Sequence, residues 1–222
     1  MRGLYLTRRP SEWSRGVVLE LWWKRTLDVV LGSTALLVSL PLMGFLALAV
    51  LLDSQGPAFF RQERVGRRGR RFRMWKLRTM HDGCDEAVHR RTAAGWFAGR
   101  SNGNGYKTLA DPRITRVGRL LRQTNLDELP QLINVVQGDM SLVGPRPAIP
   151  YELAHYRAAY FERLNVPPGM TGLWQVTRRD QLSAAEMMEL DLRYVRETSL
   201  WLDLKILAMT PGALLASTIR GS

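Results

Sequence analysis

The sequence predicts an α+β protein. A membrane-embedded re-entrant (broken) helix hairpin precedes a small, mostly helical cytoplasmic domain with a short β-hairpin and amphipathic interfacial helices. Three observations predict this class. The segment Val29–Leu52 carries no charge, residues 58–80 have the pattern of a basic β-hairpin, and residues 183–219 contain amphipathic helical stretches. We divide the chain into a lead-in (1–20), a re-entrant membrane helix (21–55) and a cytoplasmic domain (56–222).

The apolar segment is long enough to cross a bilayer, but its flanks do not suit a single span. About two dozen uncharged residues can bridge a hydrocarbon core of roughly 30 Å. Arginine and lysine crowd both sides of the segment, whereas a spanning helix is expected to be basic mainly on its cytoplasmic side. Pro41 interrupts helical hydrogen bonding, and the Ser39 hydroxyl could satisfy a backbone group freed at the break. We therefore favour a hairpin that enters one leaflet and returns. An ordinary kinked span stays open, while a buried core helix or a cleaved signal peptide fits less well.

The next segment is predicted to be a basic β-hairpin. Ala58–Gln62 and Phe72–Leu77 have the alternation of strands, and Gly66–Gly69 supplies turn residues between them. Further on, Gly95–Tyr106 is rich in glycine and asparagine and is predicted to be a loop. Helical sequence resumes near Thr115.

The last third of the chain is predicted to be helical, with a break at Pro211, after turn-rich connectors at 138–150 and 166–169. Its amphipathic helices carry apolar residues that could lie in the membrane interface or, equally, in the core. These residues are Leu190, Trp201, Leu204, Ile206 and Leu207.

The composition of the chain limits the classes of molecule that it is expected to bind. The formal net charge of +12 calls for an anionic partner such as nucleic acid, anionic lipid or a phosphorylated substrate. The sequence shows no helix-turn-helix pattern, zinc spacing or RNA-binding aromatic motif, so we do not expect nucleic acid. A single cysteine, Cys84, excludes an internal disulfide and fits a reducing cytoplasm.

The strongest candidates for catalytic residues lie in the segment Thr124–Pro130. Thr124 followed by Asp127 resembles a capping box, and Pro130 is tolerable in a first helical turn. Asp127 and Glu128 would then lie at a helix N-terminus, where the ionised form is favoured. An ionised aspartate is a competent nucleophile toward phosphorus, and an adjacent glutamate can bind magnesium. The alternative is that both acidic residues are ordinary helix caps.

Arginines surround this acidic pair. Arg122 precedes it, and Arg146 follows it between two prolines that fix its backbone. Arginine suits bidentate recognition of phosphate. A solvated surface charge is the alternative for any single arginine in the segment.

Several long motifs occur in the order seen in a known family. They are Lys24-Arg25-x-x-Asp28, Phe60-Arg61-Gln62-x-Arg64-Val65-Gly66, Lys76-Leu77-Arg78-Thr79-Met80, Asp111-Pro112-Arg113-Ile114-Thr115, Leu126-Asp127-Glu128-Leu129-Pro130-Gln131-Leu132, Asn134-Val135, 138–147 and 168–176. Over residues 22–210 the chain resembles the bacterial sugar transferases, the monotopic polyprenyl-phosphate phosphoglycosyl transferases. It is similar to a small form that holds only the catalytic core, which makes 56–222 the expected catalytic domain.

This resemblance implies a reaction. Such enzymes transfer a phosphosugar from a UDP-sugar to undecaprenyl phosphate on the cytoplasmic leaflet and release UMP. By this likeness Asp127 is the nucleophile and forms a covalent phosphosugar intermediate. Glu128 would help bind Mg²⁺, the implied cofactor, and the lipid phosphate would complete a ping-pong cycle.

The resemblance also implies binding residues and a location. Substrate-binding positions are expected at Lys76, Arg78, Arg113, Arg122, Arg146 and Gln175. Ser39 and Pro41 occupy the family's membrane break, here with Leu40 between them. The expected location is the bacterial inner membrane, with the catalytic domain facing the cytoplasm. A homodimer is compatible with such a form.

One alternative function remains at this point, a non-catalytic membrane scaffold of a polysaccharide assembly complex. The intact Asp127–Glu128 pair argues against it. The sequence leaves open which sugar is transferred and which glycan is built.

Overall fold

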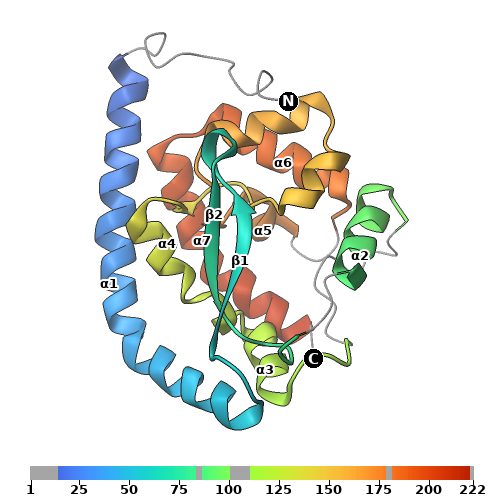
Figure 1. Ribbon diagram of the computed structural model, residues 1–222. Coiled ribbons are helices and arrows are strands. Elements are labelled where there is room, and N and C mark those ends of the chain that lie inside the picture. Colours follow the sequence, from blue (N-terminus) through green and yellow to red (C-terminus); the bar gives the residue numbers. More distant parts are fainter. Residues whose placement is uncertain (1–14, 84–86, 101–110, 179–181, 221–222) are drawn as a thin grey trace.

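A long bent helix flanks a mixed domain in which helices surround two small sheets (Figure 1). The computed structural model describes residues 15–83, 87–100, 111–178 and 182–220. Its α-helices are α1 (Arg15–Asp53), α2 (Ala87–Phe97), α3 (Arg116–Thr124), α4 (Gln131–Gln137), α5 (Leu173–Arg178), α6 (Ala184–Glu197) and α7 (Leu200–Arg220). Its strands are β1 (Phe59–Val65), β2 (Arg71–Leu77), β3 (Ser141–Val143) and β4 (Gly169–Thr171). Short 3-10 helices are η2 (Arg67–Gly69), η3 (Leu126–Glu128), η4 (Pro150–His155) and η5 (Ala158–Asn165).

The apolar segment lies in α1, which is helical from end to end with Pro41 inside it. Figure 1 shows a bend partway along the helix, so the predicted break is a bend within one helix rather than a separation into two. The Ser39 hydroxyl donates to the Leu36 carbonyl at 3.0 Å, one residue before the Leu37 carbonyl that Pro41 leaves without its usual donor. The stretch Trp22–Asp53 is long and apolar enough to cross a membrane, with a mean hydropathy of 2.6 over its most apolar window. Most of that window is not buried, which makes it compatible with membrane association.

Polar side chains in the first third of α1 fasten it to the domain. The Lys24 ammonium lies 2.6 Å from the Asp203 carboxylate of α7, which is buried. Asp28, also buried, accepts hydrogen bonds from the Ser141 hydroxyl and the Leu142 amide of β3. These contacts explain why charged residues border an otherwise apolar helix: they pair inside the protein.

Arg25 caps the far end of α4. Its guanidinium donates to the carbonyls of Val135 and Val136, each at 2.7 Å. The last carbonyls of a helix lack some of their usual amide donors, and a cation is favourable there. The Val135 carbonyl also accepts from the Gly138 amide at 3.1 Å. Gly138 ends α4 at φ 89°, and a Cβ on it would lie 3.3 Å from the Arg25 guanidinium.

The predicted β-hairpin is confirmed. β1 and β2 pair antiparallel over all seven positions, from Phe59 opposite Leu77 to Val65 opposite Arg71. The turn passes through η2, where Arg68 takes the left-handed conformation at φ 57°. Phe72 and Met74 point into the core, which also holds Leu132, Val135, Met140, Tyr194 and Ile206.

The two predicted connectors contain a second, parallel sheet, which the sequence reading missed. Ser141 pairs with Gly169 and Val143 with Thr171. The two backbone segments approach so closely that a Cβ on Gly169 would lie 2.0 Å from the Gly144 nitrogen. Glycine at 169 is therefore required by space rather than by a turn.

The predicted break at Pro211 is wrong, because α7 continues through it. Packing on both sides holds the helix: Ile206 is buried before the proline, and the Thr218 hydroxyl donates to the Gln123 carbonyl after it. Of the apolar residues predicted for the interface, Trp201 is 77% and Leu204 41% exposed. Ile206 is instead a core residue, and Leu190 and Leu207 are half-buried.

The predicted glycine-rich loop begins later than expected, because Gly95 lies inside α2. Most of that loop, from 101 onward, lies outside the described residues, as do Cys84 and most of the predicted lead-in.

Candidate active site

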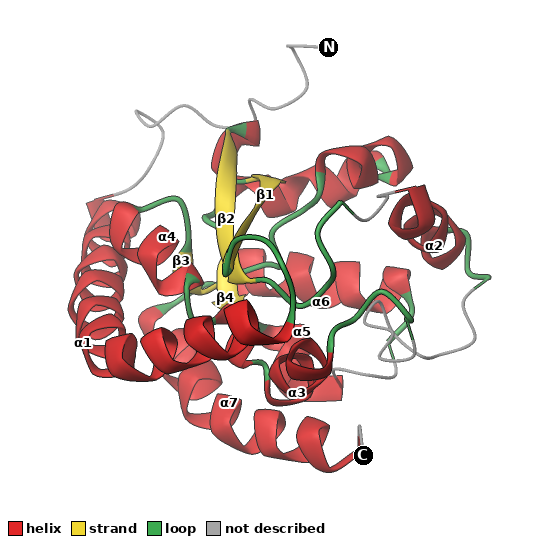
Figure 2. Ribbon diagram, turned by 60° about the horizontal axis from the view of Figure 1, so that its bottom comes forward, coloured by secondary structure: helices red, strands yellow, loops and turns green. Residues whose placement is uncertain are grey.

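The acidic pair lies in η3, a single 3-10 turn between α3 and α4. Figure 2 labels the two helices. α3 begins at Thr115, whose hydroxyl accepts from the Gly118 amide, and ends at Asn125 in the left-handed conformation, φ 58°. Thr124 is thus the last residue of α3, and its hydroxyl donates backward to the Leu120 carbonyl. The predicted capping box is therefore wrong, because Asn125 reverses the chain before Asp127.

Pro130 is the N-cap of α4, close to the first-turn position expected for it. Asp127 and Glu128 therefore precede the N-terminus of α4 by a few residues. Asp127 is only 3% exposed, whereas the Glu128 side chain is 23% exposed. One carboxylate is enclosed and its neighbour reaches solvent.

Lys76 from β2 lies beside both carboxylates. Its ammonium is 3.0 Å from Glu128 Oε1 and 3.8 Å from Asp127 Oδ2. The hairpin brings the cation there, since Lys76 is the second-last residue of β2 and η3 packs against that strand. The lysine expected from the motif is thus in the site.

Arg122, on the last turn of α3, faces the same cluster. Its Nε donates to the Thr79 hydroxyl at 2.9 Å. Burial lowers the pKa of the Arg122 guanidinium, while the neighbouring carboxylates of Asp127 and Asp111 act in the opposite direction. A half-buried guanidinium beside carboxylates can bind a phosphate group.

Arg113 is paired with Asp111. Its guanidinium contacts both carboxylate oxygens, at 2.6 Å for the shortest contact. Hydrogen bonds from Arg113 lower the pKa of Asp111 to about 2. The sequence reading quoted Asp111 in a motif without giving it a role, and Thr79 likewise. The signal for both was their place next to basic residues in two separate motifs.

Arg78 has a structural role. It is 5% exposed, and its guanidinium donates to the carbonyls of the segment that follows α1. The acceptors are Ser54, Gln55, Gly56 and Pro57. Substrate binding by Arg78 stays a prediction of the family resemblance, beside this structural role.

Arg146 and Gln175 lie in another part of the domain. Ala148, two residues after Arg146, bridges to Val65, whereas Lys76 pairs with Phe60. Five residues of β1 separate these positions, or about 17 Å along a strand. Arg146 pairs with the buried Glu152 at 3.2 Å, and the Gln175 amide donates to the Met170 carbonyl. The structure therefore gathers Lys76, Arg113 and Arg122 near the acidic pair and places these two residues elsewhere.

The acidic pair could supply part of the coordination shell of a magnesium ion. Mg²⁺ usually takes one or two carboxylates and completes its shell with waters and substrate phosphates. Asp127 and Glu128 supply carboxylates, and the exposure of Glu128 leaves room for water. Within the described part of the chain, no group of three or more His, Cys, Asp or Glu side chains could hold a metal ion by itself.

Comparison with known proteins shows the family of the chain. The family model described as "Bacterial sugar transferase" matches residues 19–217. The undecaprenyl-phosphate galactose phosphotransferase of Salmonella typhimurium is 43% identical over 187 residues, 84% of this chain and 39% of that protein. The UDP-glucose:undecaprenyl-phosphate glucose-1-phosphate transferase of Caulobacter vibrioides is 42% identical over 225 residues, 96% of this chain and 76% of that protein.

A third relative is the exopolysaccharide production protein ExoY of Rhizobium meliloti, 39% identical over 206 residues, 90% of this chain and 87% of that protein. The chain spans about two fifths of the length of several curated relatives that it matches. The matched range includes most of α1, the β-hairpin, the acidic pair and most of α7. The chain therefore belongs to the bacterial sugar transferase family.

Proposed function

We propose that this chain transfers a phosphosugar from a UDP-sugar to undecaprenyl phosphate at the cytoplasmic membrane face, releasing UMP. The observation that carries the proposal is the enclosed Asp127 beside Glu128 and Lys76. Two relatives are named for transfer of a sugar or sugar phosphate to undecaprenyl phosphate, and a third for exopolysaccharide production. The product, a polyprenyl-diphosphate sugar, begins the assembly of a bacterial polysaccharide or glycoconjugate.

The first half-reaction is a displacement at phosphorus. A carboxylate oxygen of Asp127 attacks the phosphorus that bears the sugar. The bond from that phosphorus to the bridging oxygen breaks, and UMP departs with the electron pair. The sugar phosphate is then bonded to Asp127 as an acyl phosphate.

The second half-reaction regenerates the carboxylate. A phosphate oxygen of undecaprenyl phosphate attacks the same phosphorus, and the bond to Asp127 breaks. The lipid now carries a diphosphate and the sugar. One enclosed nucleophile serving two successive substrates predicts ping-pong kinetics.

Basic residues hold the negative charge that both steps concentrate at the site. Lys76 and Arg122 bind the diphosphate of the donor, and Arg113 extends this basic surface through its pair with Asp111. Glu128 and the diphosphate would hold Mg²⁺, which supplies Lewis-acid neutralisation of the leaving phosphate. The backbone near Arg146 meets β1 about five residues from the position opposite Lys76, so we assign Arg146 to a part of the substrates away from the reacting phosphorus. We assign Gln175 in the same way.

The membrane geometry follows from the substrates. The lipid phosphate stays at headgroup height, so the site must lie there too. In this proposal α1 enters one leaflet and returns at its bend, with both ends in the cytoplasm. The exposed apolar residues Trp201 and Leu204 of α7 lie in the interface beside it.

The test is UMP release from a panel of UDP-sugars, with undecaprenyl phosphate and Mg²⁺. The proposal predicts lipid-dependent release with at least one sugar and its loss in Asp127→Asn. Glu189→Gln, an exposed carboxylate-to-amide change on α6, is the control and should retain full activity. Release that persists in Asp127→Asn would refute the covalent mechanism, and no release with any sugar would favour the scaffold.

The orientation of α1 has its own test. A cysteine placed at Ser14, in a Cys84→Ser background, should react only with reagents that reach the cytoplasm. Labelling from the periplasm alone would refute the re-entrant hairpin and favour a span. A homodimer, which such a membrane-bound form permits, can be sought by crosslinking the same single-cysteine chain.

A further inference from the structure

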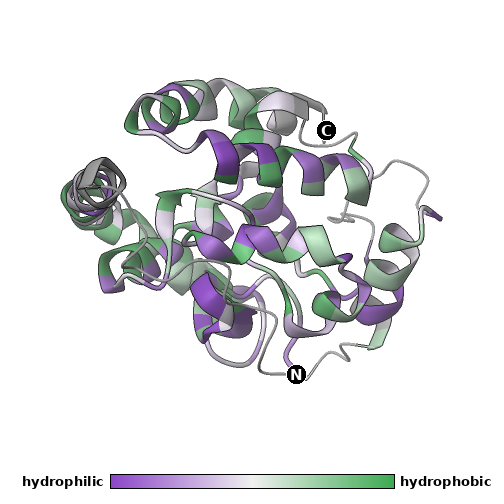
Figure 3. Ribbon diagram, turned by 90° about the horizontal axis from the view of Figure 1, so that it is seen from above, coloured by the Kyte–Doolittle hydropathy of each residue, from purple (hydrophilic) through white to green (hydrophobic). Residues whose placement is uncertain are grey.

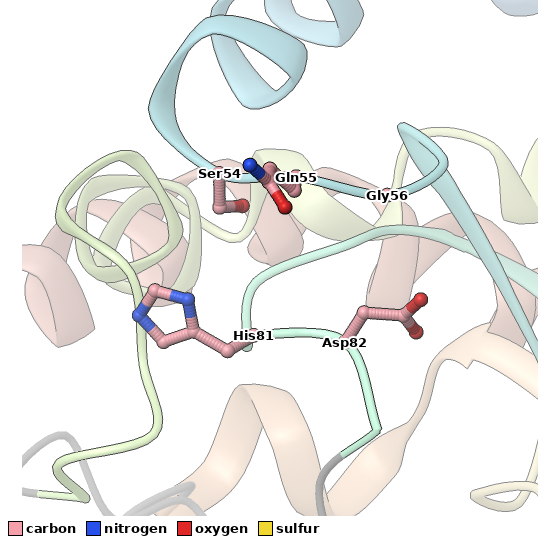
Figure 4. A pocket seen from close by; sticks show the side chains of 5 residues that line it. All are labelled: Ser54, Gln55, Gly56, His81 and Asp82. Carbon is pink, nitrogen blue, oxygen red and sulfur yellow. The ribbon is translucent and has the colours of Figure 1, made fainter.

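A cavity of about 610 Å³ opens where α1 ends, beside the segment that follows β2. Figure 4 shows its two facing walls, Ser54–Gly56 on one side and His81–Asp82 on the other. Its volume lies within the usual range for small-molecule sites. Neither the motifs nor the proposed chemistry gives these five residues a role.

Hydrogen bonds fix the backbone of the wall formed by Ser54–Gly56. The Arg78 guanidinium donates to the carbonyls of all three residues, at 2.9, 2.5 and 3.0 Å. Gly56 lies at φ +108°, where a side chain would be strained, and a Cβ there would meet Asp82 at 3.2 Å. The Ser54–Gly56 wall is therefore held in place by a buried arginine, and glycine at 56 allows it to approach Asp82 closely.

The cavity adjoins the candidate active site. Only Met80 separates His81 from Thr79, whose hydroxyl accepts from Arg122, so the backbone spans at most about 7 Å between them. The His81 amide also donates to the Arg113 carbonyl at 3.0 Å. A group bonded to a phosphate held by Arg122 could therefore reach this cavity.

The lining identifies the chemistry of the ligand. The described walls contribute a carboxylate, an amide, an imidazole and a hydroxyl, but no arginine or lysine side chain. A carboxylate repels phosphate, whereas hydroxyl groups pair well with all four side chains. The Ser54 hydroxyl is buried behind this wall and makes no hydrogen bond with the described residues.

We propose that this cavity is the subsite for the sugar ring of the donor, with Asp82 and Gln55 hydrogen-bonding its hydroxyls. The inference rests on the proposed transfer reaction, since the ring is the group bonded to the phosphorus that Asp127 attacks. In this proposal, the segment that follows the apolar helix helps to determine which sugar is bound. The lipid acceptor, whose headgroup is a phosphate, has no place in this cavity.

The experiment compares full-length Asp82→Asn and Gln55→Ala with the native chain in membranes. Both residues are exposed, so the variants should fold. We expect kcat/KM for the preferred UDP-sugar to fall about tenfold, the effect of one lost hydrogen bond. The ratio between epimeric UDP-sugars should also change. Inhibition by UDP, which lacks the sugar, and the KM for undecaprenyl phosphate should not change. Glu189→Gln is the matched control.

Each other outcome has a definite meaning. Unchanged sugar preference in both variants would overturn the subsite while leaving the transfer reaction intact. A changed KM for undecaprenyl phosphate with unchanged sugar preference would assign the cavity to the acceptor and also overturn the proposal. A native chain that releases UMP from no UDP-sugar would overturn the proposed function and, with it, this inference.

Discussion

Asn134 of α4 takes the place of a missing strand along β2. Its side-chain oxygen accepts from the Trp75 amide at 3.0 Å, and its side-chain nitrogen donates to the Arg73 carbonyl at 2.9 Å. β1 covers only one edge of β2, so the amide satisfies the other. Because Lys76 follows Trp75, and α4 follows the acidic pair, this contact fixes the lysine relative to both carboxylates.

Asn134→Leu should impair both stability and turnover. The residue is 1% exposed, so losing its two hydrogen bonds should lower the free energy of unfolding by about 2–3 kcal/mol. Turnover should fall at temperatures where the variant is still folded, because Lys76 loses its alignment. Gln137→Leu, an exposed change on the same helix, is the control. Thermal midpoints and UMP release check both effects, and unchanged turnover in a folded Asn134→Leu would contradict the positioning role.

Lys24→Met should strongly destabilise the attachment of α1. The change leaves the Asp203 carboxylate, which is 1% exposed, buried without its cation, at a cost of about 3–5 kcal/mol. The double variant Lys24→Met with Asp203→Leu should recover much of that loss, because neither charge then remains. Lys205→Met, an exposed lysine on α7, should have little effect. Thermal unfolding in detergent measures all of these, and equal midpoints for the first two variants would refute the pairing argument.

Gly169→Ala should prevent normal packing of the β3–β4 sheet. The added Cβ would lie 2.0 Å from the Gly144 nitrogen, so backbone must move. We expect a loss above about 3 kcal/mol, or failure to fold. Gly212→Ala offers the opposite case, since nothing lies within 4 Å of its Cβ and the residue is inside α7. It should be neutral or stabilising by up to about 1 kcal/mol. Expression and thermal midpoint distinguish the two.

The Asp111–Arg113 pair should give a pH-dependent contribution to stability. The pKa of Asp111 is lowered from 3.8 to about 2 in the folded chain. The unfolded chain therefore binds more protons between these values, and stability falls as pH drops from about 4 to 2. At pH 7 Asp111→Asn should cost about 1–2 kcal/mol, since the pair is partly exposed. Near pH 2 the two chains should unfold alike, and a difference that persists there would contradict the assignment.

Local patterns predicted the elements that local interactions determine. The β-hairpin followed from alternation and a glycine turn, and the start of α3 from Thr115. The same reasoning failed at Thr124, because Thr–x–x–Asp also occurs where Asn125 in the left-handed conformation ends a helix. It failed at Pro211 because packing of α7 far along the chain outweighs the local cost of proline.

The sequence predicted which types of residue form the candidate site better than it predicted how they are arranged. Lys76 and Arg122 approach the acidic pair as expected. Arg78, from the same motif as Lys76, instead binds four carbonyls, and no spacing rule separates those two roles. Arg146 was predicted from its flanking prolines, but its partner Glu152 is a buried carboxylate whose pairing depends on tertiary structure.

Two arginines join α1 to the domain. Arg25, in the first third of α1, donates to the end of α4, and Arg78 of the domain donates to the segment just beyond the end of α1. A helix held at two points cannot slide or tilt relative to the domain that holds it. If α1 lies in the membrane as proposed, a change in bilayer thickness or lipid packing that shifts α1 must tilt the whole domain with it. Lipid composition should therefore alter how substrates reach the site, while the 3.0 Å separation between Lys76 and Glu128 stays constant.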